Sequence, residues 1–472
     1  MKTFLFLLPV AAIAATPAIQ TPAAFRDASD DIAIAWKNAE PADALARGAW
    51  WRLFGDPALD DLINRALANN QDLRATVARV DQARAAAGIA RSAYWPQVAA
   101  GAGFTREQTS STTEIRFPDT RTSTYSAGLG AAWEVDLFGR VRHLTASVRA
   151  DADAAALNFE SIRLALTTDV AANYFTFRAL EDELALVRES VGLRRRAREL
   201  VQARLENGVA AELDVARAEA ELATTEAEAV ALANRHSAVR NALAVLLGDA
   251  APEFDVPARR EVALHAPPSV PSGLPAALLE RRPDIAAAER ALAAANSRIG
   301  VAKAAFFPAI SLTGSAGFAS GEIDGLFKAD SRIWSIGPSL YLPIFQGGRN
   351  RANLERSRAA YDEVVAQYRQ RVLVAFREVQ DALTATQRLA EQSAAQQRAL
   401  TAARRAASLA QTRYDAGLVS FLEVIDAQRT ALTIERGSAQ LAALRLNTAV
   451  ALIKALGGGW ERTQIVAGNS NL

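Results

Sequence analysis

The sequence predicts a mainly α-helical chain that carries a small membrane β-sheet and is arranged as an internal two-fold repeat. The helices are predicted by one proline-free stretch of about 65 residues in each half of the chain. The sheet is predicted by two shorter stretches per half in which apolar residues alternate with small or polar ones. The repeat is predicted because the two halves match at an offset of about 210 residues.

The first 15 residues have the pattern of an export signal. Met1 and Lys2 precede an apolar run, and Ala12-Ile13-Ala14 forms a small-residue cleavage pattern. We therefore expect a cleaved signal peptide over residues 1–15 and an exported mature chain. No later run reaches the roughly 20 apolar residues that a membrane helix needs. If the mature chain enters a membrane, we expect it to do so as strands.

The first repeat is predicted to cover residues 16–248. An extended arm is followed by Asp56-Pro57, which opens a helix that we expect to run to about Ala93, because Pro96 ends it. The sequence then predicts strands over 96–105 and 124–137 and a long helical hairpin over 140–247.

The second repeat follows a proline-rich linker and has the same order of elements. Asp284 through Phe307-Pro308 matches Asp72 through Trp95-Pro96 at an offset of 212 residues. The predicted ranges are the linker 249–275, the second repeat 276–460, strands 308–318 and 333–345, a helical hairpin over 349–456 and a C-terminal tail over 461–472.

The predicted strands have one apolar face and one small or polar face. Phe104, Trp133, Phe318 and Trp334 fall on the apolar side, which suits lipid and an aromatic girdle. Glycine, serine and threonine dominate the other side, which suits a water-filled lumen. Four strands cannot close a barrel, so membrane strands would require several chains to share one. The alternative is the core of an ordinary β-sandwich.

The long helices are predicted to pack along their length. A helix of 65 residues is ~100 Å long at ~1.5 Å per residue. Alanine lets such helices approach closely in a layer and leaves the charged faces to water. A hollow helical cylinder and a solid bundle both fit this pattern.

The hairpin tips carry the most distinctive residues. Gly417 ends one long helix, and Ser420 with Glu423 resembles a capping box for the next. Glu423 and Asp426 are predicted to share a face of the first turn. Gly208 and Leu213 form a similar tip in the first repeat. The plain alternative is that the two acids only stabilise a helix N-terminus, worth ~0.3–1 kcal/mol.

Several function classes are disfavoured by composition. Lys and Arg number 53 against 52 Asp and Glu, so no net charge points to nucleic acid. Because there is no Cys and the three His are scattered, we expect no disulfide, no metal site and no cofactor. We find no catalytic constellation and expect that the protein is not an enzyme.

A set of motifs resembles one known family. The set comprises Trp50-Trp51, Asp56-Pro57-Ala58-Leu59-Asp60, Glu280-Arg281-Arg282-Pro283-Asp284, Tyr414 with Gly417, Leu422-Glu423-Val424-Ile425-Asp426 and Ala455-Leu456-Gly457-Gly458-Gly459-Trp460. These residues resemble the outer-membrane channel (outer membrane factor) family of tripartite efflux pumps, in the branch serving resistance-nodulation-division transporters. The resemblance covers roughly residues 47–465.

The resemblance implies a fold and a set of partners. The implied fold is a trimeric 12-stranded β-barrel, with four strands per chain, continued by a 12-helix periplasmic α-barrel. The implied partners are two further copies of the chain, outer-membrane lipid, a periplasmic adaptor (membrane fusion) protein and an inner-membrane resistance-nodulation-division transporter. Many members of this branch carry a lipidated Cys at the mature N-terminus. Without any Cys, we expect this chain to be held by the barrel alone.

The resemblance also assigns roles to the tip residues. Leu422 and Asp426 match the ring that closes the periplasmic tip, and Glu423 matches an acidic gate position. Tyr414 matches a residue that tethers the closed state, and Arg429 is a candidate partner for the acids. The turns match the contacts with the adaptor, which we expect at Gly208, Leu213, Gly417 and Leu418.

The predicted function is a passive outer-membrane exit channel for drugs or other small molecules, gated at its periplasmic tip. We expect six carboxylates from three chains to repel one another at a closed tip. The alternatives are a channel for type I protein secretion and a periplasmic coiled-coil scaffold without a pore. The sequence does not name the substrate, although one Met and no Cys disfavour a copper or silver conduit.

Overall fold

The computed structural model describes residues 48–110, 121–257, 267–268 and 282–458. The predicted signal peptide over 1–15, nearly all of the arm, most of the linker and the tail over 461–472 lie outside these residues. The chain forms two compact units. The strand unit consists of Arg79–Ala156 and Ala287–Arg369, and the helix unit consists of the described residues within Pro22–Ala78, Leu157–Ala286 and Gln370–Leu472.

The two units do not coincide with the two sequence repeats. Each unit contains equivalent segments from both repeats. A long helix from each repeat therefore passes from one unit into the other. The repeat describes how the chain is ordered in sequence, whereas the units describe how it is packed.

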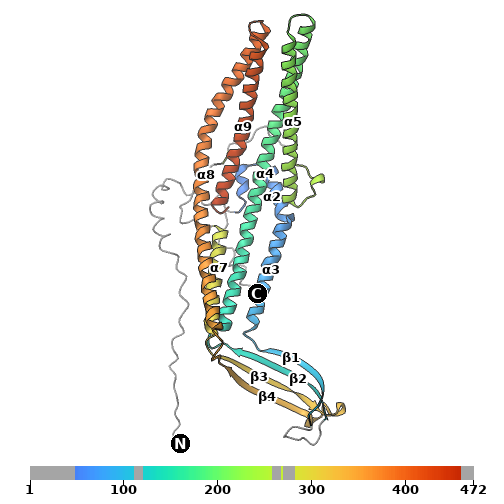
Figure 1. The fold of residues 1–472 in the computed structure, drawn as a ribbon, viewed down its shortest axis with the longest axis vertical. Helices are drawn as coiled ribbons and strands as arrows, with labels where there is room; N and C mark the ends of the chain where they lie inside the picture. Colours follow the sequence, from blue (N-terminus) through green and yellow to red (C-terminus); the bar gives the residue numbers. More distant parts are fainter. Residues whose placement is uncertain (1–47, 111–120, 258–266, 269–281, 459–472) are drawn as a thin grey trace, which may run out of the picture. The chain divides into compact units, whose positions relative to one another are not determined.

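The strand unit contains one four-stranded antiparallel sheet in the order β1-β2-β3-β4 (Figure 1). The strands are β1 (Gln97–Gln108), β2 (Arg121–Val135), β3 (Ala309–Ser320) and β4 (Arg332–Tyr341). β4 ends four residues before the predicted limit of 345. Pro343 follows closely, and a proline has no N–H to donate to a sheet.

The register of the sheet separates its two faces as the alternation predicts. One row across the sheet aligns Ala100 with Leu129, Leu129 with Ala316, and Ala316 with Trp334. On the opposite face, hydroxyl groups bridge β3 and β4. The Oγ atoms of Ser315 and Ser335 lie 2.8 Å apart, and Thr313 Oγ1 donates to the carbonyl of Gly337 over 3.2 Å.

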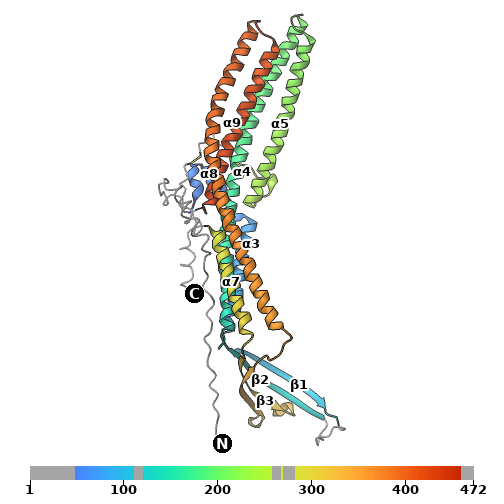
Figure 2. The ribbon, with the colours of Figure 1, turned by 60° about the vertical axis from the view of Figure 1, so that its left-hand side comes forward.

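Four long helices form two hairpins, seen in both ribbon views (Figures 1 and 2). They are α4 (Arg140–Glu206) with α5 (Glu212–Leu247), and α8 (Arg349–Asp415) with α9 (Phe421–Ala455). α4 and α8 each have 67 residues, about 100 Å of helix. No helix among the described residues has the length and apolar character needed to cross a bilayer.

The shorter elements differ from the prediction at one point. The sequence predicts a single helix from Pro57 to about Ala93, but the structure has α2 (Pro57–Asn69) and α3 (Gln71–Ser92). That prediction is wrong at Asn70. Its Oδ1 accepts the N–H of Leu73 over 2.8 Å, and its Nδ2 donates to the carbonyl of Leu246 over 2.9 Å. The side chain thus caps α3 and joins it to α5.

The remaining described elements are one α-helix and four short 3-10 helices. They are α7 (Pro283–Ala304), η1 (Trp50–Phe54), η2 (Ala251–Glu253), η3 (Ile323–Gly325) and η4 (Ala329–Ser331). As predicted, Asp56 caps α2, because its Oδ1 accepts the N–H groups of Ala58 and Leu59. Pro57 occupies the first position of that helix.

The core of the helix unit forms where η1 and α2 pack against α4, α5 and α9. Trp50 and Leu59 are fully buried there, and so is Tyr174 of α4. The Tyr174 hydroxyl donates to Asp56 Oδ2 over 2.6 Å. The buried guanidinium of Arg178 lies 5.0 Å from the Tyr174 ring centroid and donates to the carbonyl of Pro257. The Tyr174 hydroxyl and the Arg178 guanidinium thus have hydrogen-bond partners from distant segments of the chain.

The contact between Tyr174 and Asp56 predicts a loss of stability at alkaline pH. Burial, together with the hydrogen bond to Asp56, raises the pKa of Tyr174 to about 12. The unfolded value is about 10. The folded state therefore keeps its full stability below pH ~10. It loses up to ~2.7 kcal/mol as the pH rises through 12, because the buried hydroxyl ionises less readily in the folded than in the unfolded state.

We expect Tyr174→Phe to lower the free energy of unfolding by about 1 kcal/mol at neutral pH. The variant should also lose part of the alkaline destabilisation. Thermal unfolding in detergent between pH 7 and 11 would measure both effects. Tyr361→Phe, at a half-buried position of α8, serves as the control. Identical pH profiles for wild type and Tyr174→Phe would contradict the assignment.

Candidate functional site

Both hairpin tips are built by the same turn. Gly208 and Gly417 have φ values of 74° and 75°, a region that favours glycine. In the first tip, the N–H of Val209 donates to the carbonyl of Arg204 over 2.8 Å, and the N–H of Gly208 donates to Leu205. Leu418 and Gly417 repeat both bonds in the second tip. This is the Schellman arrangement, which satisfies the last carbonyls of a helix.

The predicted capping box at the second tip is wrong. Ser420 does precede α9, but its side chain forms no capping hydrogen bond. The N–H of Glu423 instead donates to the backbone carbonyl of Ser420 over 3.2 Å. The start of α9 is held by packing of Phe421 rather than by its cap, and the carboxylate of Glu423 is left at the surface.

A small hydrophobic cluster joins the two tips within one chain. Its buried members come from all four long helices and comprise Val201, Ala218, Tyr414, Phe421, Val424 and Ile425. The Tyr414 and Phe421 rings lie 5.4 Å apart between centroids, and the Arg204 guanidinium lies 4.6 Å from the Tyr414 centroid. Tyr414 is therefore part of the contact between the hairpins and is 9% exposed.

The other predicted gate residues form an exposed group at the start of α9. Leu422, Glu423 and Asp426 are all exposed. Arg429 lies one turn further along, and its guanidinium is 3.9 Å from the Asp426 carboxylate. A single chain thus brings Asp426 and Arg429 together, whereas Tyr414 lies on the buried side of the same tip.

An ionic network that sequence reasoning missed ties α9 to the first hairpin. The Glu221 carboxylate accepts hydrogen bonds from Arg194 of α4 and from Arg429 of α9. This bond to Glu221 raises the pKa of Arg429. Two turns further along, Arg436 pairs with Glu228 and lies 2.7 Å from the buried carboxylate of Glu183.

A sequence signal for this network does exist. Glu221 and Glu228 are seven residues apart on α5, and Arg429 and Arg436 are seven apart on α9. Seven-residue spacing places side chains on the same stripe of two packed helices. Without knowing which helices are neighbours, the pairing of these charges could not be assigned.

Apolar side chains are exposed at both tips. Val209 and Leu213 of the first tip are 75% and 58% exposed, and Leu418 of the second is 69% exposed. In a Schellman turn the residue after the glycine usually packs against the helix before it. Here Val209 and Leu418 point to solvent, so the tips offer apolar surface to a partner.

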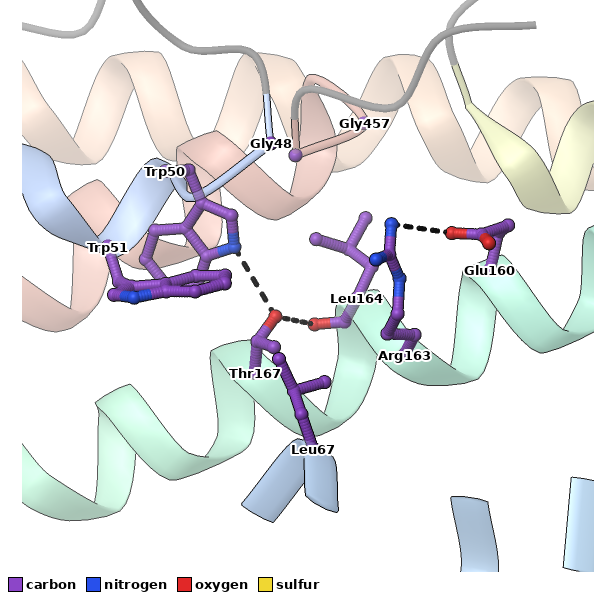
Figure 3. A pocket seen from close by; sticks show the side chains of 10 residues that line it. Gly48, Trp50, Trp51, Leu67, Glu160, Arg163, Leu164, Thr167 and Gly457 are labelled. Atoms are coloured by element: carbon purple, nitrogen blue, oxygen red, sulfur yellow. Dashed lines mark hydrogen bonds and ion pairs between the residues drawn. The ribbon is translucent and has the colours of Figure 1, made fainter. Parts of the chain in front are cut away.

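The cavity beside Trp50 is small and offers few polar groups. A cavity of about 40 Å³ lies beside Trp50, whose Nε1 donates to Thr167 Oγ1 over 3.3 Å (Figure 3). Arg163 and Glu160 form an ion pair at its edge, 2.7 Å apart. This cavity has room for a few water molecules. No group of three metal-ligating side chains occurs in the part of the chain that the structure describes.

Comparison with known proteins connects this architecture to one family. The model of the outer membrane efflux protein family matches residues 62–249 and 274–458. The solvent efflux pump outer membrane protein SrpC of Pseudomonas putida is 38% identical over 419 residues, 87% of each chain. Outer membrane protein OprJ of Pseudomonas aeruginosa is 36% identical over 465 residues, covering 98% of this chain and 96% of OprJ.

Solved structures agree with the sequence matches. A membrane protein from Pseudomonas aeruginosa superposes with a TM-score of 0.83 at 36% identity, over 91% of this chain and 99% of that one. The outer-membrane channel OprN superposes with a TM-score of 0.81 at 34% identity, over 89% and 96% of the two chains. The matches therefore include the sheet and the long hairpins together.

Because the tip glycines have positive φ angles, replacing one of them by alanine should destabilise its turn. Gly417→Ala should destabilise its turn by about 1–2 kcal/mol, because a Cβ is disfavoured in the left-handed region. We expect roughly tenfold faster backbone hydrogen exchange at the tip. Gly192→Ala, inside α4 with open space around it, should instead be neutral or stabilising. Equal effects of the two substitutions would contradict the role of the turn.

Proposed function

Because this chain belongs to the outer membrane efflux protein family, we propose that it is the outer-membrane exit channel of a tripartite efflux system. The observation that carries this function is the joint match of the sheet and the long hairpins to solved outer-membrane channels over about nine tenths of the chain. The relatives are named for solvent, toluene and antibiotic efflux. We propose that this channel likewise conducts apolar small molecules and drugs.

The barrel is formed by three copies of the chain. Each copy contributes β1 to β4, and the edges β1 and β4 pair with neighbouring copies to give 12 strands. The face with Leu129 and Trp334 contacts lipid. The hydroxyl-rich face with Ser315 and Ser335 lines the lumen, where water satisfies its polar groups.

The helical part extends into the periplasm. Six hairpins from three chains, with two per chain, form a 12-helix α-barrel around a continuous conduit. This arrangement accounts for helices that are far too long for a globular core. The leader over residues 1–15 directs export, and the barrel provides the anchor in a chain with no Cys.

The periplasmic tips form the gate. Leu422, Glu423 and Asp426 of three chains surround the narrowest point, where their carboxylates repel one another. Arg429 partly offsets this repulsion through its contact with Asp426. The same arginine binds Glu221, so it also holds α9 against α5. Opening requires α9 to move away from the first hairpin, which breaks the bond between Arg429 and Glu221.

The exposed tip residues form the docking surface for a periplasmic adaptor. Val209, Leu213 and Leu418 supply apolar contacts next to the turns at Gly208 and Gly417. An inner-membrane resistance-nodulation-division transporter supplies the drive for transport. Protein secretion remains the second candidate role within this class, and the names of the relatives favour efflux over it.

The acidic gate predicts a change in pore properties. Glu423→Ala/Asp426→Ala removes two charged side chains from the constriction and leaves smaller methyl groups. We expect single-channel conductance in planar bilayers to rise and the preference for cations over anions to fall. Glu391→Ala, at an exposed position of α8, is the control. Unchanged conductance and ion selectivity in the double variant would rule out the acidic gate.

The ionic link between hairpins predicts easier opening when it is broken. The Arg429 side chain is 57% exposed, and an exposed ion pair contributes up to ~1 kcal/mol, so Arg429→Gln should raise the open fraction by up to about fivefold in the same recordings. Arg388→Gln, which removes an exposed α8 charge, is the control. Glu221→Gln should act in the same direction, and combining it with Arg429→Gln should add little. Strictly additive effects would show that the two residues do not act through one contact.

A further inference from the structure

We propose that the lipid-facing surface of the sheet contains a binding site for one phosphorylated, multiply acylated glycolipid of the outer leaflet. An acyl chain would occupy a hollow between the strands, and phosphate groups would bind arginines at the outer end of the same face. This inference rests on the proposed function for the placement of the sheet in the outer membrane.

The hollow has the size and lining that a hydrocarbon chain requires. Its volume is about 740 Å³, within the range of small-molecule sites. The floor is made of small residues, among them Ala100, Ala127 and Ala316. Phe318 and Trp334 form its walls. A side chain from outside the strands closes one end, because the Phe327 ring packs edge-on against Phe318, 5.4 Å between centroids.

The outer part of the same face carries three arginines at staggered positions along the strands. Arg106 on β1 lies two residues beyond Phe104, and Arg121 on β2 lies four residues before Tyr125. In each pair the even spacing places both residues on one face, and the Phe104 and Tyr125 rings lie 4.7 Å apart. Arg332 on β4 pairs with Phe318 of the hollow wall and lines the hollow itself.

These arginines are available to bind an anion. Arg121 donates to Gln108 over 3.0 Å, so its charge is not neutralised by that contact. Within the described ranges, neither Arg106 nor Arg332 forms an ion pair with a carboxylate. An arginine on a lipid-facing surface costs ~2–4 kcal/mol at the bilayer centre but little at the interface. Three of them at one end therefore mark the level of the head groups.

The chain topology identifies the leaflet. All four connections from strands to helices lie at the other end of the sheet, after Ser92, before Arg140, after Ala304 and before Arg349. Since the helical part is periplasmic, the arginine end faces the outer leaflet. The lipid of that leaflet is a phosphorylated glycolipid, whose phosphates match the planar donor groups of arginine.

The spacing of the arginines favours a head group with two phosphates. β1 and β4 are three strand spacings apart, about 14 Å. The register places Arg332 in the row of Ala102, four residues or about 13 Å short of Arg106 along β1. The two arginines are therefore about 20 Å apart between their Cα atoms. A single phosphate could contact Arg106 and Arg332 together only if both side chains extended fully towards each other. A glycolipid with a phosphate at each end of its sugar unit reaches both without that constraint, and a phospholipid does not.

Native mass spectrometry of the detergent-solubilised protein would test the site with three probes: bisphosphorylated lipid A, its monophosphorylated form and phosphatidylglycerol. We expect bisphosphorylated lipid A to be retained most strongly. Arg106→Gln/Arg332→Gln should weaken its binding about 30-fold, since each interfacial charge contributes about fivefold. Arg377→Gln/Arg388→Gln removes two exposed charges from α8 and should have no effect.

A second pair of variants tests the hollow. Ala127→Leu fills it, whereas Ala131→Leu makes the same change four residues away on the same face of β2. Only the first should weaken lipid binding, by about tenfold, because it displaces buried methylene groups. Equal binding by both variants, or equal retention of the three lipids, would overturn the proposal. Planar-bilayer conductance is measured on the same samples to test the channel function separately. A wild type that conducts but binds the three lipids equally contradicts the lipid site and leaves the channel function intact.

Discussion

The open edges of the sheet are the constraint on which the rest of the structure depends. β1 and β4 each present a row of backbone N–H and C=O groups that no other strand among the described residues pairs. In hydrocarbon each unpaired group costs several kcal/mol, so a sheet with an apolar outer face must be closed by other chains. Closure by identical copies then sets the number of hairpins in the assembly. The long helices, the hydroxyl-lined face and the tips all follow from this shared assembly.

In the proposed channel, the tips combine a firm contact within one chain with repulsion between chains. Val201, Tyr414 and Phe421 bury apolar surface between the two hairpins, and Glu221 holds arginines from both of them. In the proposed gate, the exposed carboxylates of Glu423 and Asp426 oppose their counterparts in neighbouring chains. Because ionic contacts of this kind break at modest cost, the balance can shift when a partner binds the exposed apolar residues of the turns.

Much of the fold follows from the sequence because its signals are strong and local. Long proline-free stretches indicate the long helices, which end near Gly208 and Gly417, and strict alternation indicates the strands. The same elements occur in both repeats. The break at Asn70 could not be predicted, because that side chain is held by Leu246, far along the chain. The network at Glu221 was missed for the same reason. The buried position of Tyr414 depends on how the hairpins pack, which no local pattern contains.

The most direct test of the central claim is the mass of the detergent-solubilised protein. Analytical ultracentrifugation corrected for bound detergent measures how many chains share one particle. The account predicts three chains, because three four-stranded sheets are needed for a barrel of 12 strands. A particle that contains one chain, with membrane insertion intact, would contradict closure of the sheet by identical copies. A particle that contains two chains would contradict the 12-stranded barrel.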